Sequence, residues 1–146
     1  DGASFSLMRA FRQGLIEGGV EGLDPILGYE VEEMQLNGYD RLAEELVEEW
    51  GVKTSGTGRA ITEFTYISGT YDLRITCFDG EAGQSRISVM IGGEEVASFH
   101  MDEDTDCWRW RRFKDIQIRK GDEIRLEGTS DGRDGAILDY IEFIPV

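Results

Sequence analysis

The stretch "AILDYIEFIPV", residues 136–146, has the alternating pattern that decides the fold, and one of its residues does not fit that pattern. Side chains of a strand point alternately to its two faces, so every second residue from Ile137 to Phe143 shares one face. Asp139 is the one polar member of that otherwise apolar set. A carboxylate among core-facing side chains must be neutralised, hydrogen-bonded or bound to a cation, because burying it alone is costly.

The same period of two runs through most of the chain from residue 29. It is seen in the segments "YEVEEMQL", "YDLRITCF", "SRISVMIGG", "EEVASFHM" and "FKDIQIRKGDEIRLEG". Turn residues separate them, as in "SGT" at 68, "DGEAG" at 79, "GG" at 92, "KGD" at 120 and "SDGRDG" at 130. Connections this short exclude crossover helices, so the sequence predicts an all-β fold, an antiparallel β-sandwich or barrel.

Two segments depart from this pattern. Residues 1–28 contain "SFSLMRAFRQGLIEGG", whose apolar residues recur at helical spacing. This segment could be a linker, the end of a preceding domain or a helix packed on the module, and we favour a short helix that docks. The segment "DRLAEELVEEW", residues 40–50, also has helical propensity, although tertiary context can turn part of it into strand. We therefore expect an N-terminal helical or linker segment, 1–28, and one β-domain, 29–146.

Composition narrows the class of function. The 146 residues suffice for one domain with a proper core, and the net charge is -15. Nucleic acid and anionic membranes need a positive surface, so neither is an expected partner. Excess carboxylate suits calcium, a cation that prefers oxygen ligands, although most of these charges serve solubility. The sequence has no signal-peptide pattern and no apolar run near 18 residues, and we expect a module of a larger chain.

Three carboxylates are expected to meet where the first and last strands pair. As a strand, "YEVEEM" puts Glu30 and Glu32 on one face, and "LDYIEF" contributes Asp139. Terminal strands of such sandwiches commonly pair, which would bring these side chains together. Three carboxylates held close cannot all stay ionised without a counter-cation, so the pattern indicates a divalent ion.

In the order and spacing of several motifs the chain resembles a known family. These are the opening "YEVEEMQL", the glycine-containing turn "TSGTGRAI" at 54–61, "SGTYDLRITCF", "CWRWRRF" and the closing "ILDYIEF". Together they resemble the jelly-roll carbohydrate-binding modules of families six, thirty-five and thirty-six, which share a galactose-binding-like sandwich. The resemblance runs from about Tyr29 to Val146 and leaves residues 1–28 unexplained.

The resemblance implies a structural calcium ion (Ca²⁺). Its ligands would be Glu30, Glu32 and Asp139, with a backbone carbonyl of the glycine turn, at Arg59, as a further ligand. Calcium takes six to eight oxygen ligands from carboxylates and carbonyls, in keeping with this set. Asp139 is then a calcium ligand rather than a catalytic acid. The run "DEDTD", residues 102–106, could hold a second calcium, but we expect a solvated loop there.

Sugar binding requires aromatic faces that stack on pyranose rings, flanked by polar groups. The resemblance places a ligand-stacking tryptophan at Trp108, and Tyr39 and Trp50 are further candidates. Trp110, on the same strand face as Trp108, is expected to support the core. Each aromatic could instead be buried, because sandwiches bury several.

One departure from the family concerns the usual sugar site. Many members have a sugar-binding asparagine where this chain has Ile137, which donates no hydrogen bond. Either the site is dead or recognition has shifted toward "FDGEAGQSR", residues 78–86, and we favour the shift. Its polar candidates are Asp79, Gln84 and Arg86, whose alternative role is a solvated hairpin turn.

Few features of the sequence indicate a catalytic function. The single histidine, His100, lies in a strand-like run with no nucleophile motif around it, and "SGTGRA" lacks the lysine of a phosphate-binding loop. Cys77 and Cys107 could pair or remain thiols. We therefore expect a non-catalytic, calcium-stabilised module that binds a polysaccharide or oligosaccharide within a secreted, polysaccharide-active multidomain protein. The alternatives are an adhesion or assembly module of the same fold and, less favoured, a small glycan-active enzyme.

Overall fold

The computed structural model describes residues 27–41, 52–54, 56–79, 85–100, 107–130 and 136–146. Its strands are β1 (Leu27–Glu30), β2 (Gln35–Asn37), β3 (Asp40–Arg41), β4 (Val52–Thr54), β5 (Thr57–Glu63), β6 (Gly69–Asp79), β7 (Arg86–Ile91), β8 (Glu94–His100), β9 (Cys107–Ile118), β10 (Glu123–Thr129) and β11 (Ala136–Pro145). A single 3-10 turn, η1 (Val31–Glu33), separates β1 from β2. The helix expected near the N-terminus lies outside the described residues. Within them, no helix has the length and apolar character needed to cross a membrane.

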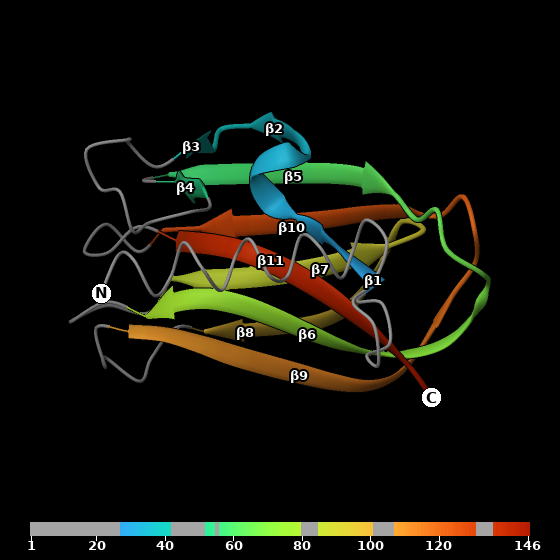
Figure 1. Cartoon of the computed structure of the whole chain (residues 1–146). Helices are drawn as coiled ribbons and strands as arrows, with labels where there is room; N and C mark the ends of the chain where they lie inside the picture. Colours follow the sequence, from blue (N-terminus) through green and yellow to red (C-terminus); the bar gives the residue numbers. More distant parts are fainter. Residues whose placement is uncertain (1–26, 42–51, 55, 80–84, 101–106, 131–135) are drawn as a thin grey trace, which may run out of the picture.

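The strands form two antiparallel sheets that face each other (Figure 1). One has six strands in the order β3-β4-β11-β6-β9, with β1 also paired to β11, and the other has five in the order β2-β5-β10-β7-β8. The predicted antiparallel sandwich is confirmed. The expected pairing of the first and last strands is confirmed as well, because β1 lies antiparallel to β11 with Leu27 opposite Phe143.

The core fills the space between the sheets because alternate residues of each strand point inward. On β6 the inward residues are Leu73, Ile75 and Cys77, and the opposite sheet contributes residues such as Leu126, all of them 0–1% exposed. Phe64, which follows β5, packs edge-on against Phe143 with ring centroids 5.0 Å apart. This contact joins the two sheets, so the apolar alternation read from the sequence is the direct cause of the two-layer fold.

The predicted "GG" turn is the hairpin between β7 and β8. Gly92 and Gly93 have φ of 60° and 89°, the left-handed conformation that a tight two-residue hairpin requires. The nitrogen of Gly92 also donates a hydrogen bond to the carbonyl of Glu123, 2.9 Å away. The turn is therefore fixed both by its glycines and by a bond to the start of β10.

The last strand contains a β-bulge at Asp139. In its pairing with β6, Leu138 lies opposite Cys77 while Tyr140 lies opposite Thr76, so Asp139 is an extra residue. One extra residue reverses which side chains face the core. Leu138 is fully buried before the bulge and Ile141 after it, whereas Ile137 is half-buried. The expectation that residues 137, 139, 141 and 143 share one continuous face is therefore wrong.

Candidate functional site

The first predicted strand is broken in two. "YEVEEMQL" forms the end of β1, the turn η1 and the start of β2, so Glu30 and Glu32 do not share a strand face. The cause is a change of sheet, because β1 belongs to the six-stranded sheet and β2 to the five-stranded one. Fully buried Val31 anchors this crossing, and its carbonyl accepts a 3.1 Å hydrogen bond from the nitrogen of Met34.

The three predicted calcium-binding carboxylates all lie near the junction of β1, η1 and β11. Glu30 is 4% exposed and pairs in register with Tyr140, the neighbour of Asp139. Asp139 itself is 0% exposed. Glu32 is half-buried in η1, which contacts β11. Nonetheless, no three His, Cys, Asp or Glu side chains in the described part of the chain are grouped closely enough to hold a metal.

Arg59 lies in a strand and not in a turn. The expected glycine turn at 54–61 is wrong for most of its length, because β4 ends at Thr54 and β5 begins at Thr57. Arg59 stands in β5 between Asn37 of β2 and Glu127 of β10. The segment forms strand because β5 has a neighbour on each side. The assignment of its carbonyl to a calcium ion stays a prediction.

The predicted sugar-binding loops fall largely outside the described residues. This holds for Gln84, Trp50 and the run 102–106, as well as for the side chains of Asp79, Cys107 and Trp108. The backbone nevertheless places two of them together: Phe78 pairs with Trp108, and Asp79 with Cys107, where β6 ends and β9 begins. Arg86 opens β7, is exposed, and makes a 3.2 Å ion pair with Glu95.

Tyr39 is a core residue, so the expectation that its ring stacks on a sugar is wrong. It is 5% exposed, and a Cβ on Gly58 would lie 2.8 Å from its ring. The ring thus rests on the bare backbone of Gly58. Burial, and secondarily the negative charge of Glu127, raises the pKa of Tyr39 well above its ordinary range. Among the described residues its buried hydroxyl has no hydrogen-bond partner.

Trp110 was expected in the core, but its side chain is 65% exposed. Outward positions on β9 are even-numbered here: Trp110 is exposed, while Phe113, opposite buried Leu73, packs toward the core. The guanidinium carbon of Arg74 lies 4.7 Å from the centroid of the Trp110 ring. Arg74 in turn donates from Nε and Nη2 to Oε1 of Glu142, over 3.0 and 2.6 Å. Alternation alone could not tell the inner face of this strand from the outer.

A second bulge on the same sheet is held by an aspartate. β6 pairs Tyr71 with Ile116 but Leu73 with Phe113, so β9 has one extra residue there. Asp72 bridges it: Oδ1 accepts a 3.0 Å bond from the nitrogen of Asp115, and Oδ2 a 2.8 Å bond from Arg112. These two bonds, the one from Arg112 first, lower the pKa of Asp72. Asp115 has φ 59°, a left-handed conformation.

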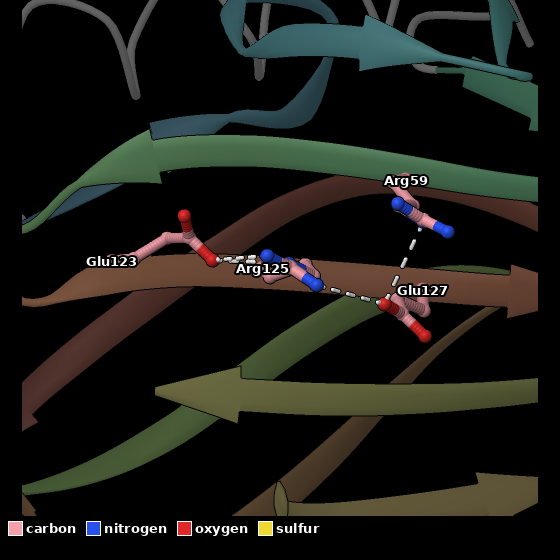
Figure 2. A network of polar contacts seen from close by, with 4 residues as sticks. All are labelled: Arg59, Glu123, Arg125 and Glu127. Atoms are coloured by element: carbon pink, nitrogen blue, oxygen red, sulfur yellow. Dashed lines mark hydrogen bonds and ion pairs between the residues drawn. The ribbon is translucent and has the colours of Figure 1, made fainter. Parts of the chain in front are cut away.

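The outer face of the five-stranded sheet carries a ladder of charges (Figure 2). Arg125 lies between Glu123 and Glu127 on β10, with contacts of 2.7 and 3.4 Å, and Arg59 of β5 lies 3.8 Å from Glu127. The acidic partners raise the pKa of Arg125. Paired strands bring these side chains together, and alternation along β10 puts its three members on one face.

A polar groove of about 630 Å³ opens at the end of the sandwich where β6 begins. Its lining includes Ser68, Thr70, Glu94, Gln117, Arg119 and Asp122. The predicted sugar loops follow the opposite end of β6, which runs from Gly69 to Asp79. The groove was not foreseen from the sequence, where its residues appear only as turn signals around "SGT", "GG" and "KGD".

The chain shares sequence with part of a larger enzyme. It is 30% identical over 135 residues to "Probable alpha-glucuronidase A" of Aspergillus terreus, an alignment that covers 80% of this chain. The chain spans only 16% of the length of that relative. No family model matches the chain.

Solved structures of carbohydrate-binding modules have the same fold. The CBM36-1 domain of a multidomain xylanase from the hindgut metagenome of Trinervitermes trinervoides matches with a TM-score of 0.67 at 17% identity, over 83% of this chain and 98% of that one. A CBM36 module in complex with calcium and xylotriose gives 0.64 at 20% identity, over 80% and 98%. A family 35 module from Clostridium thermocellum gives 0.62 at 15% identity, over 83% and 98%. A family 6 module also matches, with a TM-score of 0.64. The fold that the sequence resemblance implies is therefore confirmed.

Proposed function

We propose that this chain is a non-catalytic carbohydrate-binding module of a secreted, multidomain, polysaccharide-active protein. The observation that carries the proposal is the extent of the structural match: the chain covers 98% of modules whose whole structure is a carbohydrate-binding domain. A multidomain xylanase contains one of them, which supports attachment to a larger chain. The partial alignment with an alpha-glucuronidase is in keeping with the same setting.

The proposed sugar site lies at the end of the sandwich where β6 meets β9. Its residues are Trp108, Asp79, Gln84 and Arg86, with Trp108 stacking on the sugar and the others bonding its hydroxyl groups. Support comes from the register, which puts the backbones of Asp79 and Trp108 one pair apart. Arg86 begins β7, just after the connection that follows Asp79. Trp108→Ala should therefore weaken glycan binding and leave the melting temperature nearly unchanged, since a stacking residue contributes to the complex and not to the core.

Calcium is the proposed stabilising ion, held by Glu30, Glu32 and Asp139. What supports it is the burial of two carboxylates, Glu30 and Asp139, one register position apart across β1 and β11. Carboxylate oxygens are the ligands that calcium prefers. The backbone carbonyl of Arg59 is a further candidate ligand. Glu30, Glu32 and Asp139 would hold the ion, and the ion would neutralise their negative charges.

The calcium proposal is tested by melting curves with excess calcium and with excess chelator. An ion at a thousand times its dissociation constant adds roughly 4 kcal/mol, so chelation should lower the melting temperature clearly. Asp139→Asn should abolish that difference, whereas Glu123→Gln, a change at the charge ladder, should preserve it. Identical curves for the wild type with calcium and with chelator would rule the ion out.

The function itself is tested by a glycan-binding screen with and without calcium, using affinity gels that contain xylan, mannan or β-1,3-galactan. Retardation in at least one gel is the expected result. The same polysaccharides, incubated with the protein, should show no new reducing ends. Absence of binding throughout would favour an adhesion or assembly role, and release of reducing ends would show that the module is an enzyme.

A further inference from the structure

The exposed side chain of Trp110 lies within a strand and not in a loop or at a chain end. Among the described residues, the large apolar side chains that lie open to solvent are Ile67, Trp110 and Val146. Ile67 stands in the connection between β5 and β6, and Val146 is the final residue. Trp110 alone of these lies within a strand, on the outer face of the six-stranded sheet.

The Trp110 ring is held in position by residues of two neighbouring strands. Arg74 of β6 lies over one face of the indole, 4.7 Å from its centroid. Glu142 of β11 fixes Arg74 through Oε1, with bonds to Nε and Nη2. The order β11-β6-β9 makes these three strands adjacent. One face of the indole is thus occupied, and the ring is ordered before any ligand arrives, which lowers the entropic cost of binding.

The surroundings of Trp110 fit a sugar better than a protein. A stable protein interface covers roughly 800 Å² per partner and has an apolar centre made of several residues. Among the side chains that the structure describes, the outer positions next to Trp110 on β6 and β9 are instead Thr76, Arg74 and Arg112. An exposed aromatic face with these hydrogen-bonding groups beside it matches a pyranose ring, which has an apolar C–H face and a rim of hydroxyl groups.

We propose that Trp110, held in position by Arg74 and Glu142, is a binding platform for one pyranose ring of a neutral polysaccharide, two residues along β9 from Trp108 of the proposed loop site. The platform rests on the proposed function of the chain. The sugar stacks on the indole face away from Arg74. Arg74 and Glu142, on the other side of the ring, position the indole and do not contact the sugar. A net charge of -15 repels polyanions, so the ligand is a neutral chain.

The test is affinity electrophoresis of the whole chain in gels containing xylan, mannan or β-1,3-galactan. The wild type is compared with Trp110→Ala, Trp110→Phe and Ile67→Ala, the last as a matched loss of an exposed apolar side chain. Trp110→Ala should weaken binding roughly fivefold or more, as expected for a stacking residue, and Trp110→Phe should restore part of it. Ile67→Ala should bind like the wild type. Because Trp110 is not in the core, all melting temperatures should agree closely.

The outcomes separate the platform from the function of the module. Wild-type binding that Trp110→Ala leaves unchanged would overturn the platform while the proposed function stands. No binding by the wild type to any of the three polysaccharides would overturn both. A ligand that protects the fluorescence of Trp110 from iodide in a Trp50→Phe, Trp108→Phe variant would locate the sugar on this ring.

Discussion

The outer faces of the two sheets both carry charged side chains, but they use them differently. On the five-stranded sheet, Arg59, Glu123, Arg125 and Glu127 contact one another through the ends of their side chains (Figure 2). On the six-stranded sheet, charged side chains hold a backbone bulge and an aromatic ring in place. Asp72 bonds the backbone of a bulge. The comparison shows that the count of ion pairs says little, because a charge matters when it fixes the backbone or an aromatic ring.

Gly28 of β1 has no room for a side chain. A Cβ there would be 2.1 Å from the hydroxyl oxygen of Tyr140 and 2.4 Å from the carbonyl oxygen of Ile141. Gly28→Ala should therefore separate β1 from β11 and lower the free energy of unfolding by about 3 kcal/mol, measured by urea denaturation. Gly56→Ala is the matched control, since its Cβ would meet nothing within 4 Å. Equal stability of the two variants would contradict the described packing of β1.

Asp72 gives the next largest effect. Asp72→Ala removes the acceptor for the nitrogen of Asp115 and for Arg112 at once. The bulge of β9 then loses its cross-strand support, and the melting temperature should fall by several degrees. Asp72→Asn, which keeps an acceptor without the charge, should fall less. If the alanine variant melts with the wild type, the bulge is held by strand pairing alone.

The lowered pKa of Asp72 predicts that the stability of the fold depends on pH. A carboxyl group with a pKa lower in the folded than in the unfolded state stabilises the fold above its unfolded pKa, about 4. That contribution is lost as the pH falls from there through the folded pKa. Wild type and Asp72→Asn, melted between pH 7 and pH 2, should thus converge in stability at the acidic end. A constant difference across this range would show that the carboxylate charge plays no part.

A glycine substitution at Asp115 should raise the stability of the fold, by a smaller amount. Its φ of 59° costs a residue with a side chain about 1 kcal/mol, which Asp115→Gly relieves. Glycine's added freedom in the unfolded chain offsets part of this, so a gain of about 0.5 kcal/mol is expected by urea denaturation. Lys114→Gly, at the preceding position of β9 where φ is not positive, should be destabilising. A loss of stability in Asp115→Gly would mean that the aspartate side chain itself supports the bulge.

Arg125 should give the smallest effect of the set. It lies half-buried at the centre of the charge ladder, yet pairs on the outer face of a sheet are still screened by water and salt. Arg125→Gln should leave the melting temperature within about a degree of the wild type, at low and at high salt alike. A clear, salt-dependent loss would show that the ladder acts as a cooperative network and would remove the contrast between the faces.

The two-sheet fold could be predicted from the sequence, but the breaks and bulges within its strands could not. Alternation predicted the long strands because burial between two sheets imposes a period of two. It missed the break in "YEVEEMQL" and the bulge at Asp139, because a change of sheet or one extra residue leaves no mark in composition. Glu30 and Asp139 were nevertheless foreseen as unusual carboxylates, and both are buried.

The aromatic residues were harder to assign than the strands. Tyr39 was expected at the surface and is buried, whereas Trp110 was expected in the core and is exposed. Which face of a strand looks outward depends on partners distant in sequence: Gly58 makes room for the ring of Tyr39, and Arg74 covers one face of Trp110. Neither partner could be identified from local pattern.

The pairing of β1 with β11 has a mechanical consequence. Leu27 lies opposite Phe143 and Glu30 opposite Tyr140, so the chain enters β1 and leaves β11 at the same end of the sheet. A pull between these two points would therefore load the ladder one hydrogen bond at a time, as in unzipping, and not all bonds together, as in shear. Under tension between flanking segments, this seam would part at low force while the rest of the sandwich is still folded. The β1–β11 seam is thus the place where the domain would begin to open when stretched.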